Sequence, residues 1–223
     1  WVWHNMDAAP TRITSTGDVS PAVISPDGTQ AIFRTTVGAF GGSSFSTYRD
    51  IWLLTLTTNE VRPLMQGDTT APGNDIVRLS PTWSPDGTQI AWLEMSAPSM
   101  AHQLVTYNLS DGSFNVVASD MSYPNDIFSA WAVWGNSGIA VVYTMLNYEI
   151  EARVYQLDGS LVLNTNLGEV GTPYNVIWVN DAGQDKVGLF EYEGLLLVDL
   201  ATGESAVSTN GIEMVSLLAG NTA

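Results

Sequence analysis

Short apolar runs separated by polar turns account for most of this chain. The run Thr88–Met95 is rich in residues that suit a pleated surface and is followed by Ser96-Ala97-Pro98, a pattern typical of a β-strand. The preceding Ser84-Pro85-Asp86-Gly87 predicts a tight turn, because proline fixes φ and glycine accepts a left-handed conformation. Helical periodicity is not sustained anywhere, and no apolar run approaches the ~18 residues needed to span a bilayer. The pattern predicts an all-β chain that does not insert into a membrane.

The strand-turn-strand unit recurs along the chain. Aligned on Trp83, the same position is occupied by Ile24, Trp134 and Trp178. A third predicted strand follows each unit and ends in the triplets Leu54-Thr55-Leu56, Tyr107-Asn108-Leu109, Tyr155-Gln156-Leu157 and Val198-Asp199-Leu200. Fourth strands are predicted at Val61–Met65, Phe114–Ala118, Leu161–Asn166 and Ser205–Thr209. We therefore predict repeats of four strands, with the tryptophans at the shared position packed between neighbouring repeats.

Four-stranded antiparallel units that recur every ~40 to 50 residues are typical of β-propellers. The Ser-Pro-Asp-Gly-Thr-Gln segments within residues 21–36 and 81–95 resemble the repeats of TolB-like, WD40-like (PD40-type) propellers. Such repeats also occur in the propeller domains of tricorn-type and prolyl-oligopeptidase-type peptidases. Later copies depart from the motif, since Gly135-Asn136-Ser137-Gly138 lacks the Pro-Asp pair and Asn180-Asp181-Ala182-Gly183 has one extra residue. The resemblance implies a propeller fold but no single activity, because propellers support unrelated functions.

The repeats predict a single propeller domain, residues 1–223, with about five four-stranded blades. Four blades are predicted at about residues 18–65, 74–119, 125–167 and 170–210. A fifth, split blade combines residues 1–17 with residues 211–223, so that N- and C-terminal strands close the ring. This split blade lacks a second strand. We expect a strand from a neighbouring subunit or from further sequence to fill the gap, because unpaired strand edges are templates for pairing; direct pairing of the two terminal segments is the alternative.

The charge balance excludes one class of partner. The chain has 7 Lys and Arg against 23 Asp and Glu, a formal net charge of −16. Nucleic acid is therefore not an expected partner, because binding it requires cationic residues that displace counterions. This acidity is typical of proteins kept soluble by self-repulsion, and we expect an extracytoplasmic location: secreted, cell-surface or periplasmic. The chain opens on Trp1 rather than methionine, so we expect that an N-terminal piece has been removed or lies outside this sequence.

The long predicted loops all lie on one face, because connections between second and third strands and between successive blades emerge on the same side. These loops are residues 37–50, 66–80, 119–130 and 168–174, and we call this side the long-loop face. Function concentrates on loops displayed by a rigid scaffold, so we expect a surface that binds protein partners or copies of the chain; drift in unconstrained loops is the alternative. Aromatic and arginine side chains are the usual anchors of interfaces. The predicted partner-binding residues are Phe40, Phe45, Tyr48, Arg49, Arg78, Tyr123, Phe128, Tyr148 and Tyr174.

An Asn-Asp pair recurs on the same face. Asn74-Asp75 precedes Trp83, and Asn125-Asp126 precedes Trp134, by the same interval. We interpret both pairs as Asx-turns whose carboxylates accept backbone N–H groups at the start of a first strand. The alternative is a calcium site with Asp75 and Asp126 as ligands. Two carboxylates are few for such a site, so no metal or cofactor is predicted and calcium is kept as the alternative.

Catalytic constellations are not evident in the sequence. The only histidines are His4 and His102, and neither has metal-ligand spacing. No Gly-x-Ser-x-Gly motif occurs. The carboxylate pairs Glu149/Glu151 and Glu191/Glu193 have the i, i+2 spacing that places both on one strand face, as glycosidase chemistry would need, but we interpret them as solvated surface acids. The sequence therefore does not predict an enzyme.

Two functions follow from these observations. The first is a non-enzymatic, extracytoplasmic propeller that acts as a protein-interaction or assembly module through its long-loop face. The alternative is a propeller domain or fragment of a secreted hydrolase, peptidase or glycan-active, whose catalytic residues lie outside this chain.

Overall fold

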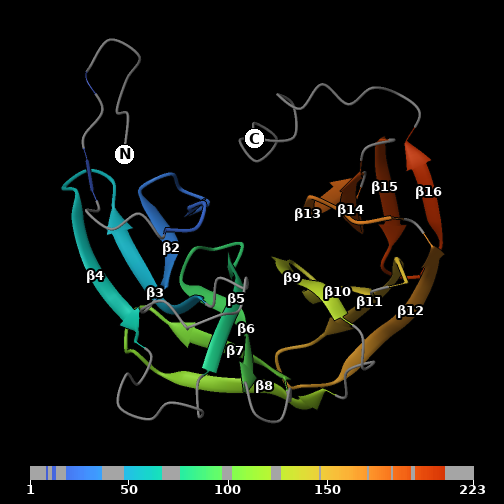
Figure 1. The fold of residues 1–223 in the computed structure, drawn as a ribbon, viewed down its shortest axis with the longest axis horizontal. Helices are drawn as coiled ribbons and strands as arrows, with labels where there is room; N and C mark the ends of the chain where they lie inside the picture. Colours follow the sequence, from blue (N-terminus) through green and yellow to red (C-terminus); the bar gives the residue numbers. More distant parts are fainter. Residues whose placement is uncertain are drawn as a thin grey trace. The chain divides into compact units, whose positions relative to one another are not determined.

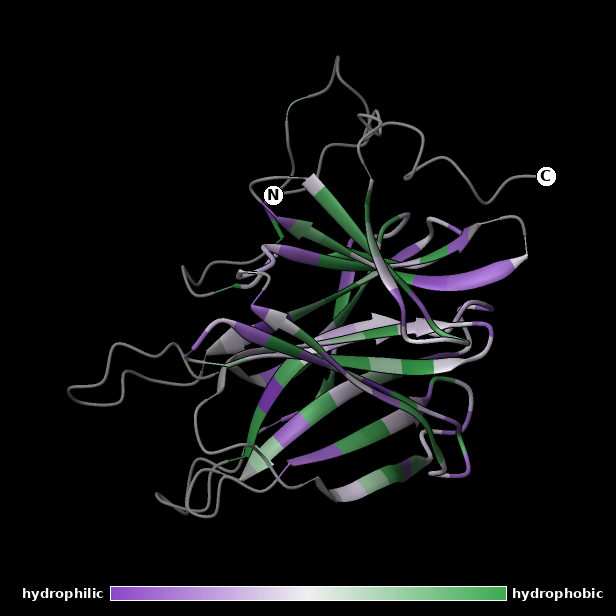
Figure 2. Cartoon of the chain, turned by 90° about the vertical axis from the view of Figure 1, so that its right-hand side faces the viewer, coloured by the Kyte–Doolittle hydropathy of each residue, from purple (hydrophilic) through white to green (hydrophobic). Residues whose placement is uncertain are grey.

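A computed structural model describes residues 9, 12–13, 19–36, 48–66, 76–96, 102–121, 127–145, 147–169, 171–181, 183–191 and 194–208. These residues form four antiparallel sheets of four strands each (Figure 1). The chain divides into two compact units, Trp1–Tyr123 and Pro124–Ala223, and each unit contains two sheets. Hydrophobic residues run along the strands of both units (Figure 2). In the described ranges, no helix is long and apolar enough to cross a membrane.

Within each sheet the strands pair in chain order. Blade 1 contains β1 (Val23–Ile24), β2 (Gln30–Thr36), β3 (Tyr48–Thr55) and β4 (Glu60–Met65). Blade 2 contains β5 (Ile76–Trp83), β6 (Gln89–Ser96), β7 (His102–Asn108) and β8 (Phe114–Met121). Blade 3 contains β9 (Ile127–Gly135), β10 (Gly138–Met145), β11 (Glu149–Tyr155) and β12 (Leu161–Glu169). Blade 4 contains β13 (Asn175–Asp181), β14 (Gln184–Glu191), β15 (Gly194–Asp199) and β16 (Ser205–Ser208).

The predicted all-β propeller architecture of four-stranded blades is confirmed. The predicted number of about five blades is wrong for the described residues, which form four. The predicted fifth, split blade cannot be compared with the structure, because its segments, residues 1–17 and 211–223, fall almost entirely outside the described part of the chain. Ring closure by the terminal strands, and donation of a strand to that blade, therefore stay predictions.

The Ser-Pro-Asp-Gly turn is stabilised by its own side chains. Asp86 Oδ1 accepts hydrogen bonds from Ser84 Oγ at 2.6 Å and from the Thr88 N–H at 3.0 Å. Gly87 has a φ of 71°, which an L side chain rarely adopts. The same bonds recur around Asp27 in blade 1. The serine hydroxyl first, and then the backbone N–H, hold the pKa of each aspartate below its ordinary value.

Side chains of both blades form the core of unit 1. Ile32 of blade 1 and Trp92 of blade 2 belong to one buried cluster with Trp83, which is 5% exposed. The Trp83 indole N–H donates to the Val23 carbonyl of blade 1 at 2.9 Å. The predicted packing of Trp83 between blades is therefore confirmed. In contrast, Ile24, at the equivalent position, is 59% exposed.

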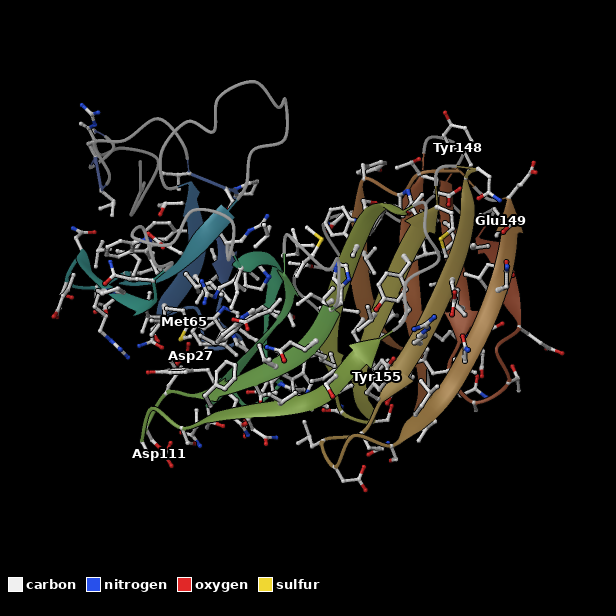
Figure 3. All side chains as sticks on the ribbon, turned by 60° about the horizontal axis from the view of Figure 1, so that its bottom comes forward. Asp27, Met65, Asp111, Tyr148, Glu149 and Tyr155 are labelled. Carbon is white, nitrogen blue, oxygen red and sulfur yellow. The ribbon has the colours of Figure 1, made fainter. Side chains whose placement is uncertain are left out.

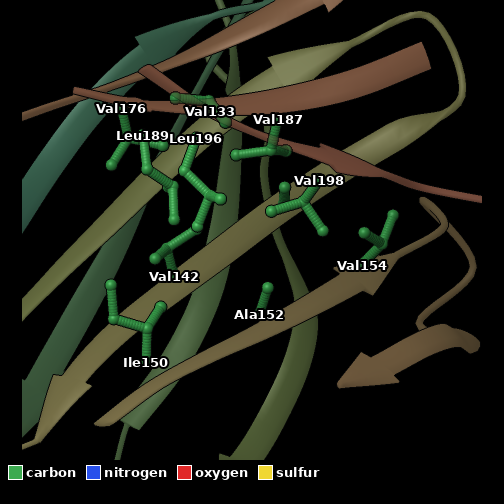
Figure 4. Close-up of a cluster of buried hydrophobic side chains, with 11 residues drawn as sticks. Val133, Val142, Ile150, Ala152, Val154, Val176, Val187, Leu189, Leu196 and Val198 are labelled. Carbon is green, nitrogen blue, oxygen red and sulfur yellow. The ribbon is translucent and has the colours of Figure 1, made fainter. Parts of the chain in front are cut away.

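The core of unit 2 lies between blades 3 and 4 and consists mainly of valine and leucine side chains (Figure 4). Val142 of β10 and Ile150 of β11 belong to the same cluster as Val187 and Leu189 of β14. Trp178 packs against this cluster.

Trp178 also lies directly over Gly135, the last residue of β9, where an added Cβ would overlap the indole ring. Glycine at position 135 thus permits close contact between the two blades.

The outer strands pair irregularly with their neighbours. The register shifts once between β3 and β4, twice between β7 and β8, and twice between β11 and β12. The outer strand of blade 4, β16, has only four residues. These shifts mark bulges, which bend the bulged strand and interrupt its hydrogen-bond ladder.

Candidate functional site

On the long-loop face, the structure describes the ends of the strands but not most of the long loops that connect them. In blade 2 this end contains a buried charged network. Arg78 of β5 lies directly opposite Glu94 of β6. Arg78 Nε donates to Glu94 Oε1 at 2.9 Å, and the two side chains are 5% and 4% exposed.

Two further side chains donate hydrogen bonds to the Glu94 carboxylate. Trp92 Nε1 donates to Oε1 at 3.1 Å, and Gln103 Nε2 donates to Oε2 at 2.8 Å. Burial of an ion pair is unfavourable unless further hydrogen bonds satisfy its oxygens. The network therefore fixes the ends of β5, β6 and β7, from which the long loops depart.

The network also reaches the neighbouring blade of unit 1. Arg34 Nη1 of β2 donates to the Arg78 carbonyl at 3.2 Å. Arg78 is thus bonded through its side chain within blade 2 and through its backbone to blade 1.

This position overturns one sequence prediction. Arg78 was predicted to lie on a loop within residues 66–80 and to contact partners. It lies inside β5, which begins at Ile76, and is 4% exposed. Its guanidinium is occupied by Glu94 because a buried charge requires a partner.

Tyr148 projects from the turn between β10 and β11, on the long-loop side of blade 3. It is 62% exposed and has a φ of 65°, which is uncommon for a bulky residue. Its N–H donates to the Met145 carbonyl at 3.0 Å, and Asn147 Oδ1 accepts from the Glu149 N–H at 3.2 Å. Figure 3 shows Tyr148 and Glu149 at one end of the blade and Tyr155 at the other.

Tyr174 lies immediately before β13, in the connection between blades 3 and 4. It is 58% exposed, and its ring centroid lies 6.1 Å from that of Phe190. Its N–H donates to the Phe190 carbonyl at 3.0 Å. Because connections between blades emerge on the long-loop face, Tyr148 and Tyr174 are exposed aromatics on the same side of unit 2.

The other predicted partner-binding residues are less fully placed. Tyr48 and Arg49 open β3 and Phe128 lies in β9, so these three belong to strands rather than loops. Phe40, Phe45 and Tyr123 lie outside the described residues, as do Asp75 and Asp126. Among the described residues, no group of three or more His, Cys, Asp or Glu side chains is arranged to hold a metal ion.

The acidic pair Glu149/Glu151 was interpreted as solvated. For Glu151 this is wrong, because its side chain is 16% exposed and accepts a bond from Arg153 Nε at 2.6 Å. The Arg153 guanidinium also lies 5.3 Å from the ring centroid of Tyr143. Burial raises the pKa of Tyr143, so its phenol stays protonated. Arg153 thus has structural partners within blade 3, Tyr155 among them.

Comparison with known proteins identifies the fold. No protein-family model and no curated protein sequence matches the chain. Several solved structures do match. TolB from Acinetobacter baumannii aligns with 12% identity and a TM-score of 0.54, over 89% of this chain and 45% of TolB. A chain of the nidogen/laminin complex aligns with 13% identity and a TM-score of 0.56, over 90% of this chain and 67% of that one.

The fold is a β-propeller similar to that of TolB. Acylaminoacyl peptidase from Pyrococcus horikoshii also matches, with 12% identity and a TM-score of 0.55, over 87% of this chain and 33% of the peptidase. The chain therefore spans less than half the length of the TolB and peptidase structures that it matches. The predicted resemblance to TolB-like propellers is confirmed at the level of fold.

Proposed function

We propose that this propeller is a non-enzymatic, extracytoplasmic module that binds protein partners, or copies of itself, through its long-loop face. The observation that supports it best is the presentation of Tyr148. A tyrosine in the left-handed region is held at an unfavourable φ by local hydrogen bonds, with its ring exposed to solvent. Such strain persists only where the surroundings impose it, and it is concentrated at functional sites.

Tyr174 supports the same face. Large aromatic side chains with a polar tip are common anchors in protein interfaces, and both tyrosines combine an apolar ring with an exposed hydroxyl. The nidogen/laminin complex is a case in which a chain of similar fold occurs in a protein–protein complex. The acidic balance of the whole chain supports an extracytoplasmic environment and a partner without net negative charge.

Site-specific photo-crosslinking tests this proposal. A photo-crosslinking phenylalanine analogue is placed at position 148 or 174, and at position 157 as the control. Leu157 is 47% exposed and lies on the opposite, short-turn side of blade 3. We expect a discrete protein adduct from positions 148 and 174 only. Equal labelling from position 157, or no adduct from the two tyrosine positions, contradicts the proposal.

The alternative is that the chain is the propeller part of a longer secreted hydrolase. The match to acylaminoacyl peptidase supports it, because this chain covers only a third of that enzyme's length. The intact mass of the protein from its source separates the two functions. A natural chain longer by a domain with a nucleophile motif favours the hydrolase; a chain close to 223 residues favours the interaction module.

A further inference from the structure

Three polar side-chain atoms of blade 3 are shielded from solvent and have no hydrogen-bond partner among the residues the structure describes. They are Ser129 Oγ, Trp131 Nε1 and Thr144 Oγ1. Thr144 is completely buried, and it is the only polar side chain other than Tyr143 in β10, Gly138–Met145. Buried polar groups in native proteins almost always have a partner, which is often an ordered water molecule. The three atoms therefore call for a ligand.

The strand register places these three side chains on one face of the sheet. Thr144 of β10 lies directly opposite Ser129 of β9, and Trp131 lies opposite Val142. Directly opposed residues share a sheet face, with Cβ atoms ~4.5 to 5.5 Å apart. Ser129 and Trp131 are two residues apart on one strand, so they also share that face. All three atoms thus belong to the face of blade 3 that packs against blade 4.

The surroundings agree with this placement. Val142 is part of the unit 2 core (Figure 4), and Trp131 packs against the same cluster. Thr144 is the penultimate residue of β10, the strand that leads into the Tyr148 turn. The polar group therefore lies at the long-loop end of the interface, the end at which β14 of the facing blade finishes in Glu191.

The chemistry of the three atoms selects the ligand. The indole N–H of Trp131 can only donate, so its partner must present a lone pair. Each hydroxyl can both donate and accept. A cation cannot accept a hydrogen bond from the indole N–H, and an apolar molecule would leave all three groups unpaired. We infer that Ser129, Trp131 and Thr144 bind one buried water molecule, which accepts from Trp131 and bonds both hydroxyls. Three partners is the usual number for such a water.

Substitution of Thr144 by valine tests the inference, because valine keeps the shape of threonine and removes the hydroxyl. If water is bound, Thr144→Val removes one of its three bonds, and Tm falls by about 2–4 °C for a chain of this size. If the hydroxyl is unpaired in the wild type, its removal raises Tm, and the inference fails. If Thr144→Val does not fold, Ser129→Ala tests the same point, and we expect its Tm to change in the same direction.

Thr165→Val is the matched control, because Thr165 lies on the outer strand β12 and is half-exposed. Its hydroxyl is accessible to bulk water, so we expect an unchanged Tm. A high-resolution crystal structure gives the direct observation. A water within about 2.7–3.2 Å of at least two of the three atoms supports the site. A direct bond between the Ser129 and Thr144 hydroxyls without water, or a dry interface, overturns it.

Discussion

Arg78 and Glu94 face each other across β5 and β6, with 2.9 Å between Nε and Oε1 and side chains that are 5% and 4% exposed. The long loops of blade 2 depart from the strand ends that this pair connects. Trp92 and Gln103 donate to the same carboxylate, so the Glu94 side chain is held by three donors.

Removal of the guanidinium leaves Glu94 buried without a cationic partner. We expect Arg78→Met to lower the free energy of unfolding by about 3–5 kcal/mol, measured by urea titration at neutral pH. The double variant Arg78→Met/Glu94→Leu should recover a large part of that loss, because no charge is then left buried. A single variant as stable as the wild type would show that the pair is not buried in solution.

The turn aspartates predict how stability depends on pH. The pKa of Asp27 and Asp86 is held below the ordinary 3.8 in the folded chain, so the folded state binds fewer protons than the unfolded one in this window. Their contribution is complete above pH ~4 and is lost as the pH falls through the folded pKa. We expect Asp27→Asn/Asp86→Asn to flatten the fall in Tm between pH 4 and pH ~2.

Ser84→Ala is the companion variant, because the Ser84 hydroxyl is the main donor to Asp86. Its loss should move the folded pKa of Asp86 up toward 3.8, so that stability is lost at a higher pH. If Tm depends on pH in both variants as it does in the wild type, the turn hydrogen bonds do not contribute to acid stability as proposed.

Close contact at Gly135 predicts an overpacking effect. Gly135→Ala introduces a Cβ into the Trp178 indole, and we expect a loss of about 1–3 kcal/mol in the free energy of unfolding. Gly188→Ala is the matched control in the same unit: its Cβ would meet Ile177 Cγ1 at 3.0 Å, a tighter contact than usual but one that flexible side chains relieve more easily. Gly135→Ala/Trp178→Leu should regain stability relative to Gly135→Ala. Equal losses in the two glycine variants would contradict this packing.

Two substitutions of Tyr148 separate its effect on stability from its effect on partner binding. Tyr148→Gly relieves the left-handed conformation and should raise the free energy of unfolding by about 1 kcal/mol relative to Tyr148→Ala, which keeps the strain. Both variants should weaken the crosslink formed from position 174 to the same extent. Thermal unfolding of the two variants checks the first point, and a glycine variant less stable than the alanine variant would refute it.

Calcium removal tests the interpretation of Asp75 and Asp126 as strand caps. We expect a chelator to leave Tm unchanged, because a capping carboxylate bonds backbone N–H groups rather than a cation. A calcium-bound propeller would instead lose stability on chelation and regain it when calcium is restored.

Much of the fold was predictable because its turns are local. Ser84-Pro85-Asp86-Gly87 forms the expected hairpin from residues that contact one another within the turn. Asn74-Asp75 marks the start of β5 at Ile76, but residues 76–80 were also assigned to a loop. In this segment Ser80 has a φ of 47° and the register shifts between Leu79 and Thr82, which breaks the alternation that marks a strand.

The candidate site was harder to predict because its interactions join distant segments. Glu94 is the one acidic residue in an apolar strand, which signals a buried partner, but the sequence does not show that the partner is Arg78. Likewise, Tyr148 is exposed, as expected of a loop aromatic, whereas its backbone conformation depends on a turn that the sequence did not mark. Residue type alone also does not separate the buried Arg78 from an exposed arginine.

The irregular pairing of β4, β8 and β12 has a consequence for behaviour at high concentration. A straight, fully extended outer strand offers a continuous row of free N–H and C=O groups, from which sheets of separate molecules can grow into fibres. The bulges interrupt that row in three blades, and in the fourth the strand is only four residues long. Growth of sheets between separate molecules through these four outer strands is thereby disfavoured.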